Sequence, residues 1–354
     1  MGKTYHATPK STDAATEGPA AGEHLLIGGH GGAIRGIAIT PDGALAVSAS
    51  NDRTLKVWDL AGGCGRFTLE GHEGPVCAVA VIPDGARAVS ASYDRTLRVW
   101  DLVGGRQLLT LQGHAGVVRA VAVTPDGRWA ISASYDRRLK IWDLTTGQDE
   151  YTLVGHHEWV VAVAVTSDGS RAVSASHDGR LRVWHLPDGQ VQLTLKGHEG
   201  RPLAVAVTPD GSQAVSAASD GTLRVWDLAD GAERFKLEGH RRWVLAVAVT
   251  PDGKQAVSAC ANGIQKVWDL AGGREQFVLE GHDGAVRALA VTPDGTSVAS
   301  ASDDGLVKLW DLGAGRPVAD FHIGSAVCDC VVAPDGKTLV AGDAGGRVRL
   351  LRLP

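Results

Sequence analysis

The sequence predicts an all-β repeat protein in which similar four-stranded units pack side by side. Three observations predict this fold class: a Gly-His pair and a tryptophan each recur every 42 residues, and a Pro-Asp-Gly turn lies between them in most units. The histidines are His30, His72, His114, His156, His198, His240 and His282, and the tryptophans are Trp58, Trp100, Trp142, Trp184, Trp226, Trp268 and Trp310. A period in the forties indicates a repeat architecture, in which each unit buries its apolar faces against its neighbours.

The second unit shows how each unit is built. Short apolar runs punctuated by Gly and Pro predict strands over residues 76–81, 87–91, 96–101 and 107–111. The turn after the first strand is Pro83, Asp84 and Gly85, in which Pro presets φ, Asp bonds nearby backbone and Gly accepts a positive φ. The first strand is apolar on both faces, so we expect neighbouring sheets to cover both faces.

The turns indicate eight units. Pro-Asp-Gly begins at positions 41, 83, 125, 209, 251 and 293, a Ser-Asp-Gly variant begins at 167, and an eighth copy begins at 334. Only seven fourth strands follow these units. Segment 23–27 supplies the missing one, because Leu25 and Ile27 occupy the places of Phe67 and Leu69. We therefore expect segment 23–27 to pair with segment 348–353, which removes both exposed strand edges.

The repeated Gly-His, Pro-Asp-Gly, turn Asp and Trp-Asp motifs resemble those of the WD40-repeat β-propeller family, and the closely matched units look like bacterial tandem WD40 arrays. The resemblance covers residues 23–354. It implies a closed eight-bladed β-propeller of four-stranded antiparallel blades, with the N-terminal strand closing the last blade. Trp-Asp itself occurs in six units, whereas the fourth has Trp184 and His185, and the eighth has Leu351 and Arg352.

Composition argues against several function classes. The formal net charge of −5 gives no reason to expect a nucleic-acid partner. The sequence contains no run of eighteen apolar residues, so we expect no membrane span. The five cysteines occupy no repeated position, so we interpret them as free thiols of a cytoplasmic protein. We expect a monomer with no cofactor and no metal, and interpret His156, His157 and His177 as network or surface histidines. Residues 1–22 have almost no large apolar residues and are predicted to be a disordered tail.

Ser, His and Asp recur in every regular unit, and these residue types also form the catalytic triad of acyl transfer. The repetition argues against an active site, because an enzyme does not need seven copies. The family resemblance instead implies a structural network, in which Asp94 accepts from His72, His72 bonds a strand serine, and that serine bonds the indole of Trp100. Ser90 is the expected serine, and Ser92 is the alternative because both point to the same face. We expect this network in units one to five and seven. Asn262 replaces the turn Asp of the sixth unit, which weakens the charge-assisted bond there.

Variation at otherwise regular positions predicts a partner-binding rim. The resemblance implies that partner-binding side chains lie at the start of each first strand and just before each turn Asp. The candidates at these positions are Tyr93, Arg119, Tyr135, Trp159, Val161, His177, Arg201, Leu203, Trp243 and Leu245. Trp, Tyr and Arg are the residue types enriched in interface hot spots. The alternative interpretation is that these aromatic residues pack on neighbouring loops.

The sequence therefore predicts a protein-interaction scaffold without catalytic activity. The alternative function is a small-molecule receptor or enzyme that uses the central channel. A receptor needs convergent polar groups, and the regular Ala and Val of the first strands offer few.

Overall fold

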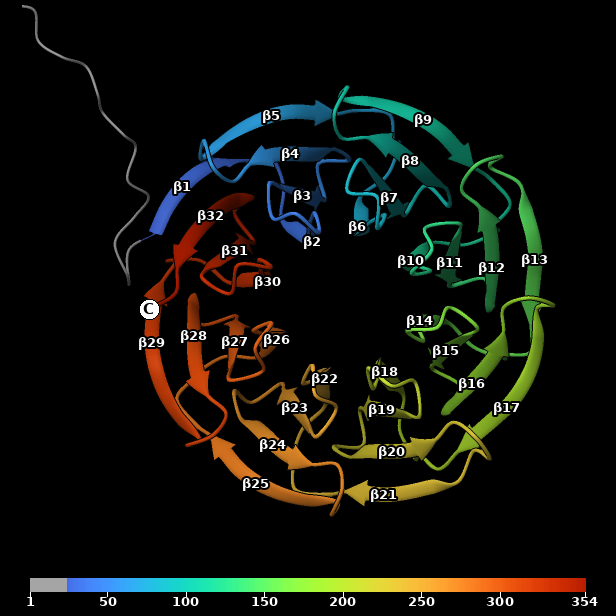
Figure 1. Cartoon of the computed structure of the whole chain (residues 1–354), viewed down its shortest axis with the longest axis vertical. Coiled ribbons are helices and arrows are strands. Elements are labelled where there is room, and N and C mark those ends of the chain that lie inside the picture. The colour runs from blue at the N-terminus through green and yellow to red at the C-terminus, as the bar shows by residue number, and fades with distance from the viewer. Residues whose placement is uncertain (1–23) are drawn as a thin grey trace, which may run out of the picture.

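The computed structural model describes residues 24–354, which form eight four-stranded antiparallel sheets in a ring (Figure 1). In each blade the first strand is innermost and the fourth lies on the circumference. The expected closed eight-bladed β-propeller is confirmed. The tail expected over residues 1–22 lies outside the described residues. No helix within residues 24–354 is long and apolar enough to cross a membrane.

The strands follow the repeat along the chain. Blade 1 contains β2 (Ile34–Ile39), β3 (Leu45–Ser50), β4 (Leu55–Asp59) and β5 (Cys64–Leu69), and blade 2 contains β6 (Val76–Val81), β7 (Arg87–Ser92), β8 (Leu97–Asp101) and β9 (Arg106–Leu111). Blade 3 contains β10 (Val118–Val123), β11 (Trp129–Ser134), β12 (Arg138–Asp143) and β13 (Asp149–Val154), and blade 4 contains β14 (Val160–Val165), β15 (Arg171–Ser176), β16 (Arg180–His185) and β17 (Gln190–Lys196).

The second half of the ring repeats this order. Blade 5 contains β18 (Pro202–Val207), β19 (Gln213–Ala218), β20 (Leu223–Asp227) and β21 (Glu233–Leu237), and blade 6 contains β22 (Val244–Val249), β23 (Gln255–Cys260), β24 (Gln265–Asp269) and β25 (Arg274–Leu279). Blade 7 contains β26 (Val286–Val291), β27 (Ser297–Ser302), β28 (Leu306–Asp311) and β29 (Arg316–His322). Blade 8 contains β30 (Val327–Val332), β31 (Thr338–Asp343), β32 (Arg347–Arg352) and β1 (His24–Gly29).

The turns act as the sequence predicts. In blade 2, Asp84 Oδ1 accepts the backbone N–H of Ala86 at 2.9 Å, and Gly85 adopts a φ of 70°. The innermost strand differs from expectation in one respect, because most of β6 is half-buried rather than covered on both faces. Its side chains border the centre of the ring, where no further sheet packs against them.

The hydrophobic cores lie between adjacent blades. Val47, Val57 and Leu69 of blade 1 form one core with Trp100 and Leu102 of blade 2. Each of the seven repeated tryptophans packs against the preceding blade in this way, and none is more than 2% exposed. Because every core needs two blades, no unit can bury its apolar surface alone.

Strand β1 closes the ring. It pairs antiparallel with β32, with His24 opposite Leu351, Leu25 opposite Leu350 and Leu26 opposite Arg349. The two ends of the described chain therefore lie in one sheet, where blue β1 runs beside red β32 (Figure 1). The predicted pairing of the N-terminal segment with the last strand is confirmed.

Candidate functional site

The polar network of blade 2 links three side chains to the tryptophan. His72 Nδ1 donates to Asp94 Oδ2 at 2.7 Å, and the Ser90 hydroxyl donates to His72 Nε2 at 2.7 Å. The Trp100 indole N–H donates to Ser90 Oγ at 2.8 Å. This assignment uses the neutral imidazole with its proton on Nδ1, the tautomer in which every group has a partner.

The same three bonds occur in blades 1 to 5 and 7, with lengths of 2.7–3.1 Å. Ser90 and its equivalents in the other five blades are fully buried, and each already accepts a hydrogen bond from an indole N–H. A hydroxyl in this position cannot reach a substrate, so this Ser-His-Asp arrangement has a structural role rather than that of a catalytic triad.

Blades 6 and 8 depart from the pattern. In blade 6 the bond between histidine and turn residue is lost rather than weakened: His240 Nδ1 has no partner within the described residues. The reason is local, because the Asn262 amide oxygen accepts from the Cys260 thiol instead. In blade 8 the network is replaced by a shorter one, in which the Ser325 hydroxyl donates to Asp343 Oδ2 at 2.6 Å.

The variable positions lie on one face of the ring. In blade 2, Val76 at the start of the first strand pairs with Ser92 at the end of the second, so the loops beyond both ends meet. We call this side the histidine face, because it carries the Gly-His loops and the turn Asp loops.

An aromatic cluster crosses from blade 3 to blade 4 on the histidine face. The rings of Tyr135 and Trp159 stack at a centroid distance of 4.3 Å and an interplanar angle of 9°. The His177 ring is tilted against that of Trp159, with a centroid distance of 5.8 Å and an interplanar angle of 35°. Burial and the nearby positive charge of Arg201 both lower the pKa of His177. A hollow of about 360 Å³ lies beside the cluster and is lined by Glu158, Trp159, His177 and Arg201.

The two rim tryptophans remain accessible despite these contacts. Trp159 is 46% exposed and Trp243, at the same repeat position two blades on, is 58% exposed. Trp159 is thus partly packed on neighbouring loops, as the alternative interpretation expected. Trp243 has no aromatic neighbour among residues 24–354. Its flanking residues Arg241 and Arg242 are exposed as well.

The other candidate residues divide into two groups. Val161, Leu203 and Leu245 are half-buried at the second position of their first strands. Tyr93 and Arg119 line a cavity at the centre of the ring. This cavity adjoins the aromatic cluster, because burial raises the pKa of Tyr135 and the nearby positive charge of Arg119 opposes that effect. The proposed rim therefore brings together Tyr135, Trp159, His177 and Arg201, with Trp243 on the same face.

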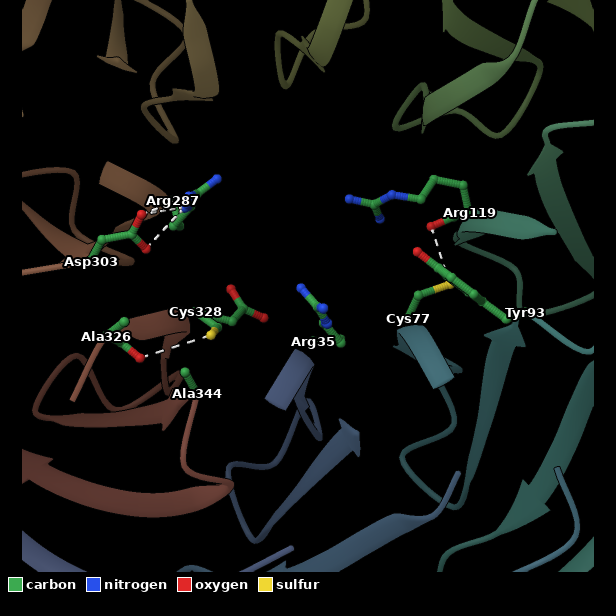
Figure 2. Close-up of a pocket in the computed structure, with 10 residues that line it drawn as sticks. Arg35, Cys77, Tyr93, Arg119, Arg287, Asp303, Ala326, Cys328 and Ala344 are labelled. Atoms are coloured by element: carbon green, nitrogen blue, oxygen red, sulfur yellow. Dashed lines mark hydrogen bonds and ion pairs between the residues drawn. The ribbon is translucent and has the colours of Figure 1, made fainter. Parts of the chain in front are cut away.

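The central cavity has a volume of about 430 Å³. Its lining residues are Arg35, Cys77, Tyr93, Arg119, Arg287, Asp303, Ala326, Cys328, Asp329 and Ala344 (Figure 2). They come from blades 7, 8, 1, 2 and 3. The expectation that the channel offers few polar groups is wrong on the histidine face, where this cavity lies. One signal was available in the sequence: Arg35, Arg119 and Arg287 all stand five residues after the Gly-His histidine.

Asp329 is a second polar feature of the central cavity, and the repeat pattern did not predict it. It stands where the other blades have Ala or Gly. Its Oδ2 accepts the backbone N–H of Ile37 in blade 1 at 2.7 Å, and its Oδ1 accepts that of Cys330 at 2.9 Å. Burial raises the pKa of the Asp329 carboxyl to about 7. Within residues 24–354, no group of three or more His, Cys, Asp or Glu side chains is placed to hold a metal ion.

The comparisons agree with this geometry. The sequence matches the family "WD domain, G-beta repeat" eight times, over residues 23–59, 63–101, 105–143, 147–185, 189–227, 231–269, 273–311 and 315–351. The chain belongs to the WD40 repeat family. WD40 propellers generally serve as protein-interaction scaffolds and are typically non-catalytic.

A solved structure resembles this one across nearly its whole length. It is the crystal structure of the computationally designed Ika8 protein, which is 31% identical in sequence, with a TM-score of 0.83. The match covers 93% of this chain and 98% of the designed one. The comparison with curated proteins finds no match.

Proposed function

We propose that this WD40 propeller is a non-catalytic scaffold that binds a protein partner on the histidine face across blades 3 to 6. One observation carries the proposal: two tryptophans at identical repeat positions expose about half of their surface on one face. Exposed aromatic side chains are costly to leave in water, and Trp is enriched in interface hot spots. Neither tryptophan belongs to the seven that build the cores between blades.

The surroundings of Trp159 suggest the chemistry of the partner. A stacked aromatic centre bordered by Arg201 and His177 has the arrangement of an apolar anchor pocket with a polar border. The guanidinium of Arg201 can hold a carboxylate through two hydrogen bonds. A partner segment that carries an acidic residue beside an aromatic one fits this hollow.

Affinity capture from the native cell extract, read by mass spectrometry, tests the proposal. The double variant Trp159→Ala, Trp243→Ala should lose the partners that the unchanged protein retains. The matched control is Val103→Ala, Val318→Ala, which removes exposed apolar surface outside the proposed rim and should retain them. Circular dichroism and thermal melting establish that both variants are folded. If the tryptophan variant is folded and captures the same partners as the control, the rim assignment is wrong.

A further inference from the structure

Three arginines share one repeat position and enter one cavity. Arg35, Arg119 and Arg287 are exposed and come from blades 1, 3 and 7. Figure 2 shows their side chains projecting from the blades into the open centre of the cavity. The same position in blades 4 to 6 holds Val161, Leu203 and Leu245. The positive charge is therefore gathered on one half of the ring.

The carboxylates of the described residues do not balance this charge. Arg287 is paired with Asp303, whose carboxylate accepts from Nε at 3.0 Å and from the terminal amino group at 2.6 Å. Arg35 donates its Nε–H to the neutral amide oxygen of Asn51 at 2.9 Å. Within residues 24–354, no carboxylate oxygen lies within 4.0 Å of a side-chain nitrogen of Arg35 or Arg119. These two guanidinium groups have donors left to offer a ligand.

Asp329 adds only part of a negative charge to the central cavity at neutral pH. Its two oxygens accept backbone N–H groups, and no cationic side chain pairs with it in the described chain. Because burial raises the pKa of its carboxyl to about 7, a substantial fraction is protonated near neutrality. Three arginines against Asp303 and a partly ionised Asp329 leave the cavity with a net positive charge, although the protein as a whole has a formal net charge of −5.

We propose that the central cavity binds a small, multiply charged anion, with Arg35 and Arg119 as its main ligands and Arg287 as the third. Guanidinium groups bind phosphate and carboxylate oxygens through paired hydrogen bonds, so the ligand can carry either of these anionic groups. A volume of about 430 Å³ lies in the range of small-molecule sites. The charge is confined to the centre of the ring, which favours a small ligand over an extended nucleic acid.

Calorimetric titration of the full chain with pyrophosphate and with citrate, at near-physiological salt, tests this proposal and distinguishes the two anion types. At least one probe should bind in the micromolar range. Arg35→Gln and Arg119→Gln should each weaken that binding about tenfold or more, in keeping with the loss of charge-assisted bonds. The matched control is Arg137→Gln, an exposed arginine of the histidine face outside the cavity, which should bind as the unchanged protein does.

Melting temperatures of the ligand-free variants show whether each is folded. We expect all three to be folded, because the substituted side chains are exposed. Failure of both probes to bind the unchanged protein below about 1 mM would overturn the proposal. So would an equal loss of binding in Arg137→Gln and Arg119→Gln, since this would indicate a diffuse charge effect. The site adjoins the proposed rim at Tyr135 but contains neither Trp159 nor Trp243, and loss of captured partners in the tryptophan variant leaves this test unaffected.

Discussion

Each repeated tryptophan stabilises the fold in two ways at once. Trp100 donates to Ser90 inside its own blade and packs against Val47, Val57 and Leu69 of the preceding blade. One residue therefore couples the polar network of a blade to the core that joins two blades. A substitution at this position is therefore expected to destabilise both the blade and its packing against the preceding blade.

The first prediction concerns this coupling. Trp100→Ala should lower the free energy of unfolding by about 3–5 kcal/mol, because it opens a cavity in a fully buried core. Urea denaturation followed by circular dichroism measures the change. Trp243→Ala is the control, and its effect should stay below about 1 kcal/mol because that side chain is 58% exposed. A loss below about 1 kcal/mol for Trp100→Ala would contradict the structural role of the network.

The network histidines also make stability depend on pH. Burial lowers the pKa of several of them, namely His30, His156, His198, His240 and His282. For a histidine whose folded-state pKa lies below its unfolded value, the unfolded chain binds more protons at intermediate pH. The stability contribution is then fully present above the unfolded pKa of 6.5 and is lost as pH falls toward the folded pKa.

The second prediction uses the exceptional histidine of blade 6. The pKa of His240 falls from 6.5 to about 4, because it is buried, the positive charge of Lys266 acts in the same direction, and no carboxylate opposes these effects. This shift corresponds to roughly 3 kcal/mol of stability lost between pH 6.5 and pH 4. Asn262→Asp supplies the missing acceptor, raises the pKa of His240 and should reduce this pH dependence. Urea midpoints at pH 7.5 and pH 5 measure it. An unchanged difference between the two pH values would show that His240 does not titrate on its own in this range.

At the scale of the element, blade 6 is the least satisfied blade of the ring. Gln265 is fully buried at the start of β24, and both its amide oxygen and its amide nitrogen have no hydrogen-bond partner in the described chain. Leucine stands at this position in blades 1 to 5, at residues 55, 97, 139, 181 and 223. Buried amide groups without partners lose their bonds to water and gain nothing in exchange.

The third prediction follows from this defect. Gln265→Leu should raise the free energy of unfolding by about 1–3 kcal/mol, because it replaces two unsatisfied polar atoms with an apolar side chain of similar volume. The reciprocal control is Leu223→Gln in blade 5, which should destabilise the protein by at least as much. Both are measured by urea denaturation. A loss of stability in Gln265→Leu would mean that Gln265 has a partner in solution.

The sequence predicted the strands of blade 2 to within a residue, because Gly and Pro turns mark where each strand must end. It could not predict the central cavity, since its arginines come from blades 1, 3 and 7 and meet only when the ring closes. The stack of Trp159 on Tyr135 was hidden for the same reason, because it joins two blades. The broken bond of blade 6 depends on a choice between Cys260 and His240 as the partner of Asn262, which composition does not determine.

At the scale of the whole molecule, the propeller depends on one strand that is distant in sequence from its partners. Strand β1 brings Ile27 into the core that contains Trp58 of blade 1 and Val348 and Leu350 of blade 8. Without β1, this core loses a member and β32 becomes an exposed edge. An unpaired edge presents free backbone N–H and C=O groups to other chains and favours aggregation.

The fourth prediction tests this closure. Deletion of residues 1–28 should lower the melting temperature sharply and promote aggregation, because it removes the pairing of β1 with β32 and the burial of Ile27. Deletion of residues 1–20 is the matched control, since it leaves β1 intact, and it should melt as the full chain does. Thermal scans by circular dichroism and light scattering compare the three proteins. Ile27→Ala should fall between the two truncations, because the strand remains but its buried side chain is shortened. If the two truncated proteins melt together with the full chain, the ring is held by its seven complete blades and β1 contributes nothing to its closure.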